Sequence, residues 1–206
     1  MAGALAVEHR ATPPAAFQHA REIVRSGAKL DTAHLAGEVG VARATLYRWT
    51  GDRNRLLCDV AWAEVASLIR RLERAATGDG VEWLERIAAG FLAAIADNPG
   101  RRSFLTLEGD TGVRLVTAPR GGVRSRIVTA VAELIEAEVA AGRYTSPDEP
   151  HLLADGIVSL GERIASSRSS ASPFLYNAGD LSLNPDPQTA RHIVQLVLRE
   201  PAAVRG

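Results

Sequence analysis

Residues 32–52 read TAHLAGEVGVARATLYRWTGD, and this stretch decides the fold of the first part of the chain. Its apolar residues lie at positions whose side chains would pack between two crossing helices: Leu35, Val39, Val41, Leu46 and Trp49. Ala36 is small where the second helix would pass closely, and Gly40 stands where the turn needs a positive φ. The spacing predicts helices over 32–39 and 42–49 joined as a helix-turn-helix. A plain packing corner between two helices is the alternative.

The segments on either side of this motif also follow a helical period. Phe17, Ala20 and Val24 share one face of a helix over 15–26. Asp52 is a suitable cap for a long amphipathic helix that ends near residue 75. Beyond the break at 77–80, the pattern predicts helices over 81–97, 101–107, 123–141, 149–169 and 187–199. No stretch alternates as a strand would, so we expect an all-α fold.

These boundaries predict four parts along the chain. They are a flexible N-terminal arm over 1–14, a three-helix helix-turn-helix domain over 15–55, a connecting helix and linker over 56–80, and a second helical domain over 81–206. The 206 residues are 46% hydrophobic and 23% charged, which is ordinary for a globular protein of one or two domains and argues against wholesale disorder.

Charge is balanced over the whole chain but not near the motif. With 24 basic and 24 acidic residues the formal net charge is zero, which argues against a nonspecific nucleic-acid coat. Between residues 43 and 55, however, four arginines accompany a single aspartate, Asp52, which leaves a local charge of +3. Cations therefore gather beside the helix-turn-helix, although a solvated basic face would show the same excess.

Several other functions find no support in the sequence. The most apolar uncharged run, Ile87–Ala96, has ten residues where a membrane-spanning helix needs about 20. The start of the chain does not resemble a secretory signal, so we expect a cytoplasmic protein without membrane contact. No nucleophile–base pair, paired carboxylates or metal-ligand spacing stands out, and we expect no catalysis, cofactor or metal. His151 and Asp155 could face a common ligand but are interpreted as a surface pair or a cap, because no third ligand is evident. Cys58 is interpreted as an inert buried thiol rather than a redox sensor.

The segment RATLYRW at 43–49, followed by Gly-Asp-Arg53 and Leu56-Leu57, resembles the DNA-binding domain of TetR family transcriptional regulators. The residues 46–53 are also similar to a smaller, QsdR-like subgroup of that family. The resemblance covers roughly residues 15–72, and beyond them only the order of helices agrees. Two departures are an alanine, Ala42, where the family often has a serine cap, and Trp49-Thr50 in place of a common His-Phe pair.

The resemblance implies a role for each matching residue of the second motif helix. Thr45, Tyr47 and Arg53 match positions that contact backbone phosphate, while Arg43, Ala44 and Arg48 would face the groove of double-stranded DNA. An arginine can hold guanine O6 and N7 with two parallel hydrogen bonds. Tyr47 could instead be a half-buried core aromatic with its hydroxyl at the surface.

For the second half, the resemblance implies an effector pocket and a two-fold homodimer. The pocket candidates are large groups on largely apolar helices: Trp83, Phe91, Arg102 and Phe104. The interface candidates form apolar stripes on the last two long helices: Ile157, Leu160, Ile164, Ile193 and Val197. The same stripes would suit a core within one chain. Residues 170–186 either cover the pocket or pack on the dimer partner.

Together these patterns favour a sequence-specific DNA-binding regulator. The resemblance implies a repressor that binds a palindromic operator as a homodimer and is released by a small-molecule effector. A different class of function is a helical protein-interaction module, in which the helix-turn-helix is only structural. Exposure of the second motif helix distinguishes the two, because base readout requires its side chains to face solvent.

Overall fold

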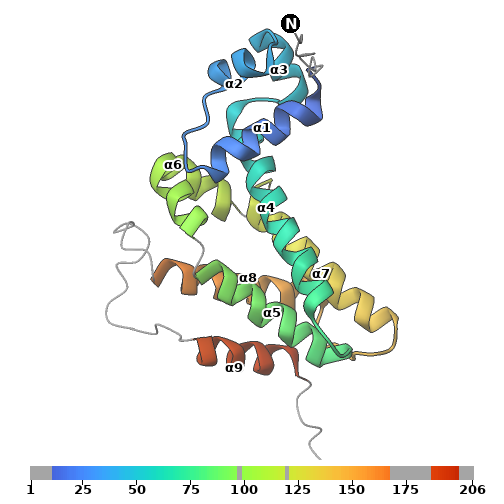
Figure 1. Ribbon diagram of the computed structural model, residues 1–206. Helices are drawn as coiled ribbons and strands as arrows, with labels where there is room; N and C mark the ends of the chain where they lie inside the picture. The colour runs from blue at the N-terminus through green and yellow to red at the C-terminus, as the bar shows by residue number, and fades with distance from the viewer. Residues whose placement is uncertain (1–10, 97–98, 119–120, 168–186, 200–206) are drawn as a thin grey trace, which may run out of the picture. The chain divides into compact units, whose positions relative to one another are not determined.

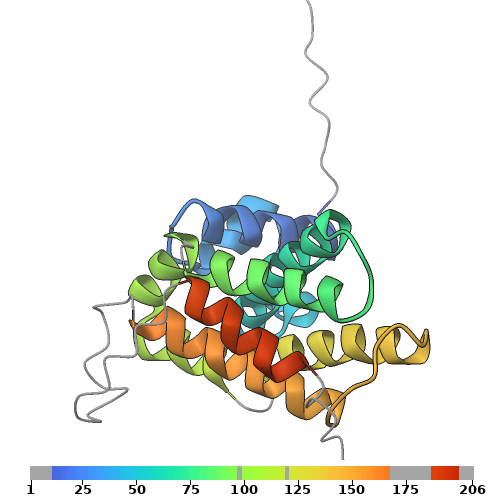
Figure 2. The same cartoon turned by 90° about the horizontal axis from the view of Figure 1, so that it is seen from below.

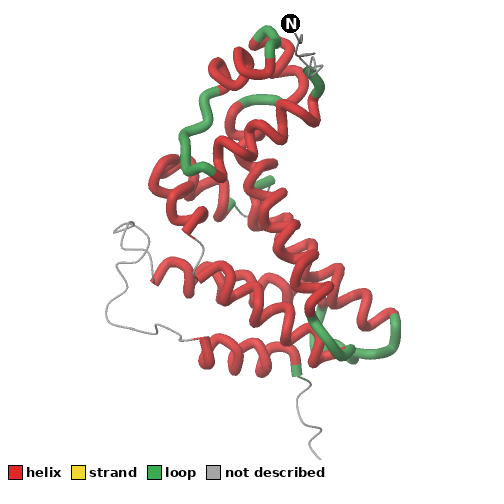
Figure 3. Tube along the Cα trace, in the orientation of Figure 1, coloured by secondary structure: helices red, strands yellow, loops and turns green. Residues whose placement is uncertain are grey.

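The computed structural model describes residues 11–96, 99–118, 121–167 and 187–199. Within these ranges the chain forms nine helices and no strand (Figures 1 and 3), which confirms the all-α prediction. The chain divides into two compact units, Met1–Val60 and Ala61–Gly206. Helix α4 (Arg53–Ala75) begins in the first unit and continues into the second. None of the described helices is both long and apolar enough to cross a membrane.

The first unit is a small three-helix domain with the start of α4. Helix α1 (Pro13–Arg25) packs against α2 (Thr32–Val39) and α3 (Arg43–Thr50), and α2 packs against α3. Helix α1 begins two residues earlier than the sequence predicted. Prolines suit the first helical turn, where their missing N–H is not needed, and the Thr12 hydroxyl accepts from the backbone N–H of Ala15.

The second unit is built from the rest of α4 and five further helices. They are α5 (Gly80–Ala96), α6 (Pro99–Thr117), α7 (Val123–Ala140), α8 (Pro150–Ser167) and α9 (Pro187–Leu198). Helix α8 packs against α7, α5 and α9, and α9 also packs against α5. Figure 2 shows α9 in red alongside α8 in orange and α5 in green. Four of these five helices lie within two residues of their predicted bounds.

Helix α6 is the exception, because it has 19 residues where the sequence predicted seven. The sequence indicated a helix over 101–107, whereas α6 runs from Pro99 to Thr117 with a kink at Gly109. Gly109 has φ 52° and ψ −134°, a backbone conformation that interrupts a helix and that glycine adopts readily. The polar residues after the kink carry only a weak apolar period, so the second half of the helix was not apparent.

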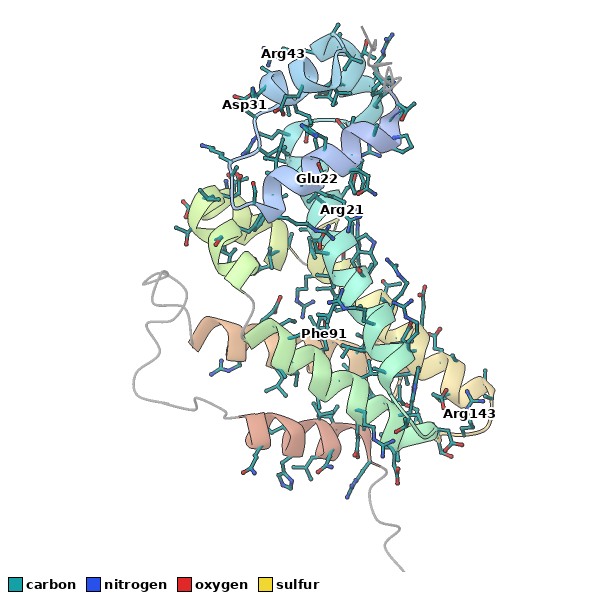
Figure 4. All side chains as sticks on the ribbon, in the orientation of Figure 1. Arg21, Glu22, Asp31, Arg43, Phe91 and Arg143 are labelled. Carbon is teal, nitrogen blue, oxygen red and sulfur yellow. The ribbon has the colours of Figure 1, made fainter. Side chains whose placement is uncertain are left out.

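A buried carboxylate joins two loops of the second unit. Glu138 on α7 is 5% exposed and accepts from Nε and Nη2 of Arg143 at 2.9 and 2.6 Å, and from the backbone N–H of Gly80 at 2.8 Å. The hydrogen bond from Arg143 is the main reason that the pKa of Glu138 lies below its ordinary value, and the Gly80 bond adds to it against the opposing effect of burial. Figure 4 marks Arg143.

A second ion-pair network ties α7 to α8. Arg124, whose side chain is 15% exposed, donates to Asp155 at 2.8 Å, to Ser159 at 3.0 Å and to Glu162 at 3.2 Å. These three partners share one face of α8, and the bond from Arg124 lowers the pKa of Asp155. The sequence interpretation paired Asp155 with His151 and did not anticipate Arg124, since only tertiary packing brings it there.

Candidate nucleic-acid interface

The turn between α2 and α3 has the geometry that the sequence predicted. Leu35 and Leu46 are 0% and 2% exposed and pack inside the unit, and Gly40 ends α2 with φ 76°. The Asp31 carboxylate caps α2 by accepting from the N–H groups of His34 and Ala33 at 3.0 and 2.7 Å, which lowers the pKa of Asp31. These contacts fix the direction in which α3 leaves the turn.

Helix α3 presents a polar and basic face to solvent. Arg43, Ala44 and Arg48 are exposed, and Tyr47 is 64% exposed. This exposure contradicts the alternative in which Tyr47 is a half-buried core aromatic. Thr45 is half-buried and accepts from Nη2 of Arg48 at 3.3 Å. Positions 43 and 47, and positions 44 and 48, are one turn apart, so they form two adjacent rows on this face.

An open groove of about 380 Å³ lies beside α3 within the first unit. Its lining comes from α2, α3, the following turn and the start of α4: Thr32, Arg43, Ala44, Leu46, Tyr47, Thr50, Gly51, Asp52 and Arg53. Arg43 lies close enough to Asp31 to contribute to lowering the pKa of that carboxyl, and Figure 4 shows both at one end of this unit. Sequence reasoning missed Thr32, although a hydroxyl in the first turn of α2 could have been considered.

Arg53 is anchored as well as exposed to the groove. Its Nε donates to the backbone carbonyl of Leu30 at 2.7 Å, so the start of α4 is tied to the loop before α2. Asp52 caps α4 through its carboxylate, which accepts from the N–H of Arg55 at 2.7 Å. No sequence signal indicates the carbonyl of Leu30 as a partner, because the contact joins residues that are 23 positions apart.

The first turn of α3 has no side-chain cap. Ala42 adopts an extended conformation at the N-cap position, with φ −66° and ψ 144°, and its side chain cannot accept a hydrogen bond. Alanine at this position therefore leaves α3 without the side-chain cap that a serine would provide. The recognition-type helix is therefore less stabilised at its start than α2, which Asp31 caps.

The three pocket candidates whose side chains are described do not meet at one site. Phe91 lines a small apolar cavity in the second unit, while Trp83 lines a separate open pocket with Glu138 and Arg143. Phe104 is buried on α6, where its ring lies next to Gly112. The side chain of Arg102 lies outside the described residues, as do residues 170–186.

The four interface candidates whose side chains are described differ in exposure within the single chain. Ile157 is 2% exposed and already packs inside the second unit, whereas Leu160, Ile193 and Val197 are half-buried. The side chain of Ile164 lies outside the described residues. Two leucines on the same helices, Leu152 at 57% and Leu196 at 65%, are the more exposed apolar groups. Leu196 belongs to the wide apolar stripe of the last helix but was not chosen as a candidate, and Leu152 was not part of the stripe predicted for α8.

Comparison with known proteins agrees with this architecture. The family model described as "Tetracyclin repressor-like, C-terminal domain" matches residues 79–199. A comparison with curated proteins gave no match.

Three solved structures are similar over most of both chains. The transcriptional repressor QsdR of R. erythropolis, from the TetR family, is 24% identical, with a TM-score of 0.72 over 90% of this chain and 93% of that one. The TetR family repressor AlkX of Dietzia sp. strain DQ12-45-1b is 19% identical, with a TM-score of 0.57 over 91% and 94%. The regulator FadR of Bacillus subtilis, in complex with stearoyl-CoA, is 12% identical, with a TM-score of 0.52 over 91% and 100%. These likenesses concern the fold. The family model spans more than half of the residues, and the chain therefore belongs to the TetR family of transcriptional regulators.

Proposed function

We propose that this protein is a repressor that reads its operator with α3. The observation that carries the proposal is the exposed face of that helix, where Arg43, Ala44, Tyr47 and Arg48 face solvent on a helix-turn-helix scaffold. A structural helix-turn-helix in a protein-interaction module would have no need of two exposed arginines and an exposed tyrosine in adjacent rows. Residues 15–55 are the proposed DNA-binding part, 56–80 the connection, and 81–206 the effector-binding and dimerisation part.

The side chains of α3 suit two kinds of contact with double-stranded DNA. Arg43, Ala44 and Arg48 are proposed to face the bases, because an arginine guanidinium can bind guanine bidentately in the major groove. Thr45, Tyr47 and Arg53 are proposed to contact phosphates, which position the protein without reading sequence. The anchoring of Arg53 on Leu30 supports this role, since it holds the guanidinium at the groove beside α3.

A homodimer would give this short helix its specificity. One eight-residue helix contacts few base pairs, whereas two copies about 34–36 Å apart would read both halves of a palindrome. The exposed Leu152 on α8 and Leu196 on α9 support an interface there, because large apolar side chains gain free energy when they leave water. We also place Ile164 and the half-buried Leu160, Ile193 and Val197 in this proposed interface. Ile157 would support that interface from inside the unit.

A small-molecule effector is proposed to bind the second unit and release the DNA. Support comes from the family assignment and from FadR, a similar fold whose structure contains stearoyl-CoA. QsdR and AlkX are repressors, which supports repression here. An effector releases DNA only if it binds the DNA-incompetent state more tightly than the competent one. We place the protein in the cytoplasm and assign it no catalytic activity.

Capture of sheared DNA from the source organism on the purified chain, followed by sequencing, tests this proposal directly. A shared palindromic sequence among the bound fragments is expected, and light scattering should give the mass of a dimer. Capture without sequence preference, together with a monomeric mass, would contradict a regulator and favour the interaction module.

Variants of α3 then test the roles of single residues on the captured operator. Arg43→Ala or Arg48→Ala should lose about 1–3 kcal/mol of discrimination at one base position per half-site. Tyr47→Phe and Arg53→Ala should instead weaken binding to specific and random duplexes alike. Arg70→Ala is the matched control, because Arg70 is exposed on α4 but belongs to the second unit. Equal losses on both duplexes for every variant would refute base readout by α3.

A further inference from the structure

Thr45 and Thr50 lie on the same helix, but their hydroxyls have different partners. The Thr50 hydroxyl donates to the carbonyl of Leu46 at 3.0 Å, the local bond that a threonine inside a helix often makes. Thr45 lies in the first turn of α3, which begins at Arg43, so the carbonyl four residues earlier lies outside the helix. The Thr45 oxygen accepts from Nη2 of Arg48 at 3.3 Å instead, and its own proton is donated to none of the described residues.

This contact distinguishes the two arginines that are proposed to face the bases. Arg48 is held by Thr45. Arg43 is close enough to feel the charge of Asp31, yet its side chain forms no hydrogen bond with any residue that the structure describes. Immobilising a long side chain when a complex forms lowers the affinity about two- to tenfold. Arg48 therefore enters a complex with part of this ordering already done, and Arg43 does not.

The contact with Thr45 leaves Arg48 able to bind a base. A guanidinium has five N–H donors, so several remain when one is bonded to Thr45, and two parallel donors are enough for O6 and N7 of guanine. The hydroxyl proton of Thr45 suits a phosphate oxygen, which is the contact proposed for this residue above. We propose that Thr45 positions Arg48 for base readout, so that Arg48 contributes more to operator selectivity than Arg43. This inference rests on the DNA-binding role proposed for α3.

Thr45→Val tests this role, because valine keeps the branched shape of threonine but has no hydroxyl. Binding to single-base variants of the captured operator measures discrimination at each position, and Arg48→Ala identifies the position that Arg48 reads. At that position Thr45→Val should lower discrimination about two- to tenfold, since only the correct base must then immobilise an unheld arginine. The lost phosphate contact should weaken all duplexes equally. Thr45→Ser, which keeps the hydroxyl, should retain the discrimination.

Double variants separate positioning from a direct role of Thr45. Added to Arg48→Ala, Thr45→Val should change discrimination at no position, whereas added to Arg43→Ala it should cause the same loss as in the unmodified chain. Thr111→Val is the matched control, because Thr111 accepts from Nη2 of Arg114 at 3.4 Å in the same arrangement, three residues apart, in the second unit. Thermal unfolding reports whether each variant is folded, and Thr45→Ala replaces Thr45→Val if the valine variant is not. A loss that is equal at all positions, or that persists beside Arg48→Ala, would overturn the positioning role.

A measurement without DNA keeps this inference separable from the proposed function. In nuclear magnetic resonance of the full chain, the order parameter of the Arg48 Nε–H group should exceed that of Arg43, and Thr45→Val should lower it to the Arg43 level. Capture of no specific DNA sequence would contradict the regulator and this inference together. An operator captured by a chain in which Thr45→Val neither loosens Arg48 nor alters discrimination at its base position would overturn this inference alone.

Discussion

The two units of this protein use arginine in opposite ways. In the first unit Arg43 and Arg48 are exposed on α3, and Arg48 donates a hydrogen bond to its neighbour Thr45. In the second unit Arg124 has three partners on α8, and Arg143 holds the buried carboxylate of Glu138. A guanidinium without a buried partner adds little to stability and stays available to a ligand, whereas Arg124, which is largely buried, and Arg143, which binds a buried carboxylate, are part of the folded structure.

Arg53 lies between these two cases. Its Nε is bound to the Leu30 carbonyl, yet its side chain lines the groove beside α3. It therefore contributes to the structure of the first unit while lying where a phosphate would bind. The burial of an arginine and of its partners, rather than its residue type, therefore separates the arginines that stabilise the fold from those proposed to bind DNA.

The largest effect on stability is expected from Glu138→Ala. This variant leaves the buried N–H of Gly80 without its acceptor and removes the hydrogen bonds from Arg143, which should cost about 2–3 kcal/mol of unfolding free energy. Chemical denaturation measures it. Glu133→Ala, an exposed site on the same helix, should change stability by less than about 0.5 kcal/mol. Equal losses at both positions would contradict the role of the Glu138 contacts.

The same carboxylate predicts a pH dependence. Since the folded state lowers the pKa of Glu138 below its ordinary value of 4.5, its stabilising contribution is complete above that pH and is lost as the pH falls through the lower, folded value. Asp155, whose pKa is also lowered, adds to the loss in acid. Glu138→Gln should therefore show a shallower decline in unfolding free energy below about pH 4.5. If the decline in unfolding free energy below about pH 4.5 were unchanged in Glu138→Gln, other groups would control the loss of stability in acid.

The next largest effect on stability is expected when the same substitution, arginine to methionine, is made once in each unit. Arg124→Met should cost about 1–2 kcal/mol of unfolding free energy, because Asp155 and Glu162 lose their cation but are exposed enough for solvent to screen part of the loss. Arg48→Met should leave stability within about 0.5 kcal/mol and weaken operator binding instead. Denaturation and operator titration of both variants check this. A stability loss in Arg48→Met as large as in Arg124→Met would remove the contrast between the units.

The smallest effect concerns the start of α3. Ala42→Ser should stabilise the first unit by about 0.5–1 kcal/mol, because the extended backbone at the N-cap already suits a serine whose hydroxyl can accept from the first turn. Thermal unfolding measures the gain, and Ala44→Ser on the exposed face of the same helix serves as its control. A gain of the same size at both positions would mean that capping is not its source.

Local patterns predicted the first unit well. The bounds of α2, the left-handed Gly40 and the buried Leu35 and Leu46 depend on residues within one short segment. The missing cap at Ala42 also follows from a single residue. Such features could be predicted because turn chemistry and helix periodicity act over a few positions along the chain.

Features created by tertiary packing could not be predicted. The partners of Arg124 lie 31 to 38 residues away, and nothing near Glu138 in the sequence indicates that it accepts from Gly80. The pocket candidates were chosen by size, and the fold separates Trp83 from Phe91. Exposure decides which apolar residues can join an interface, and a wide stripe could not distinguish Leu196 from the inward-facing Val194.

Helix α9 has a consequence for the order in which the protein is made. It supplies Val194 and Leu198 to the interior of the second unit, and the hydroxyl of Tyr144 donates to the Leu198 carbonyl. Glu85 on α5 accepts from Gln195 and Arg199 across 110 and 114 residues. The interior of the second unit therefore cannot close until the ribosome has added residues near 199, whereas the contacts of the first unit are complete by about residue 60. For most of its synthesis the nascent chain therefore carries a complete first unit and an incomplete second unit.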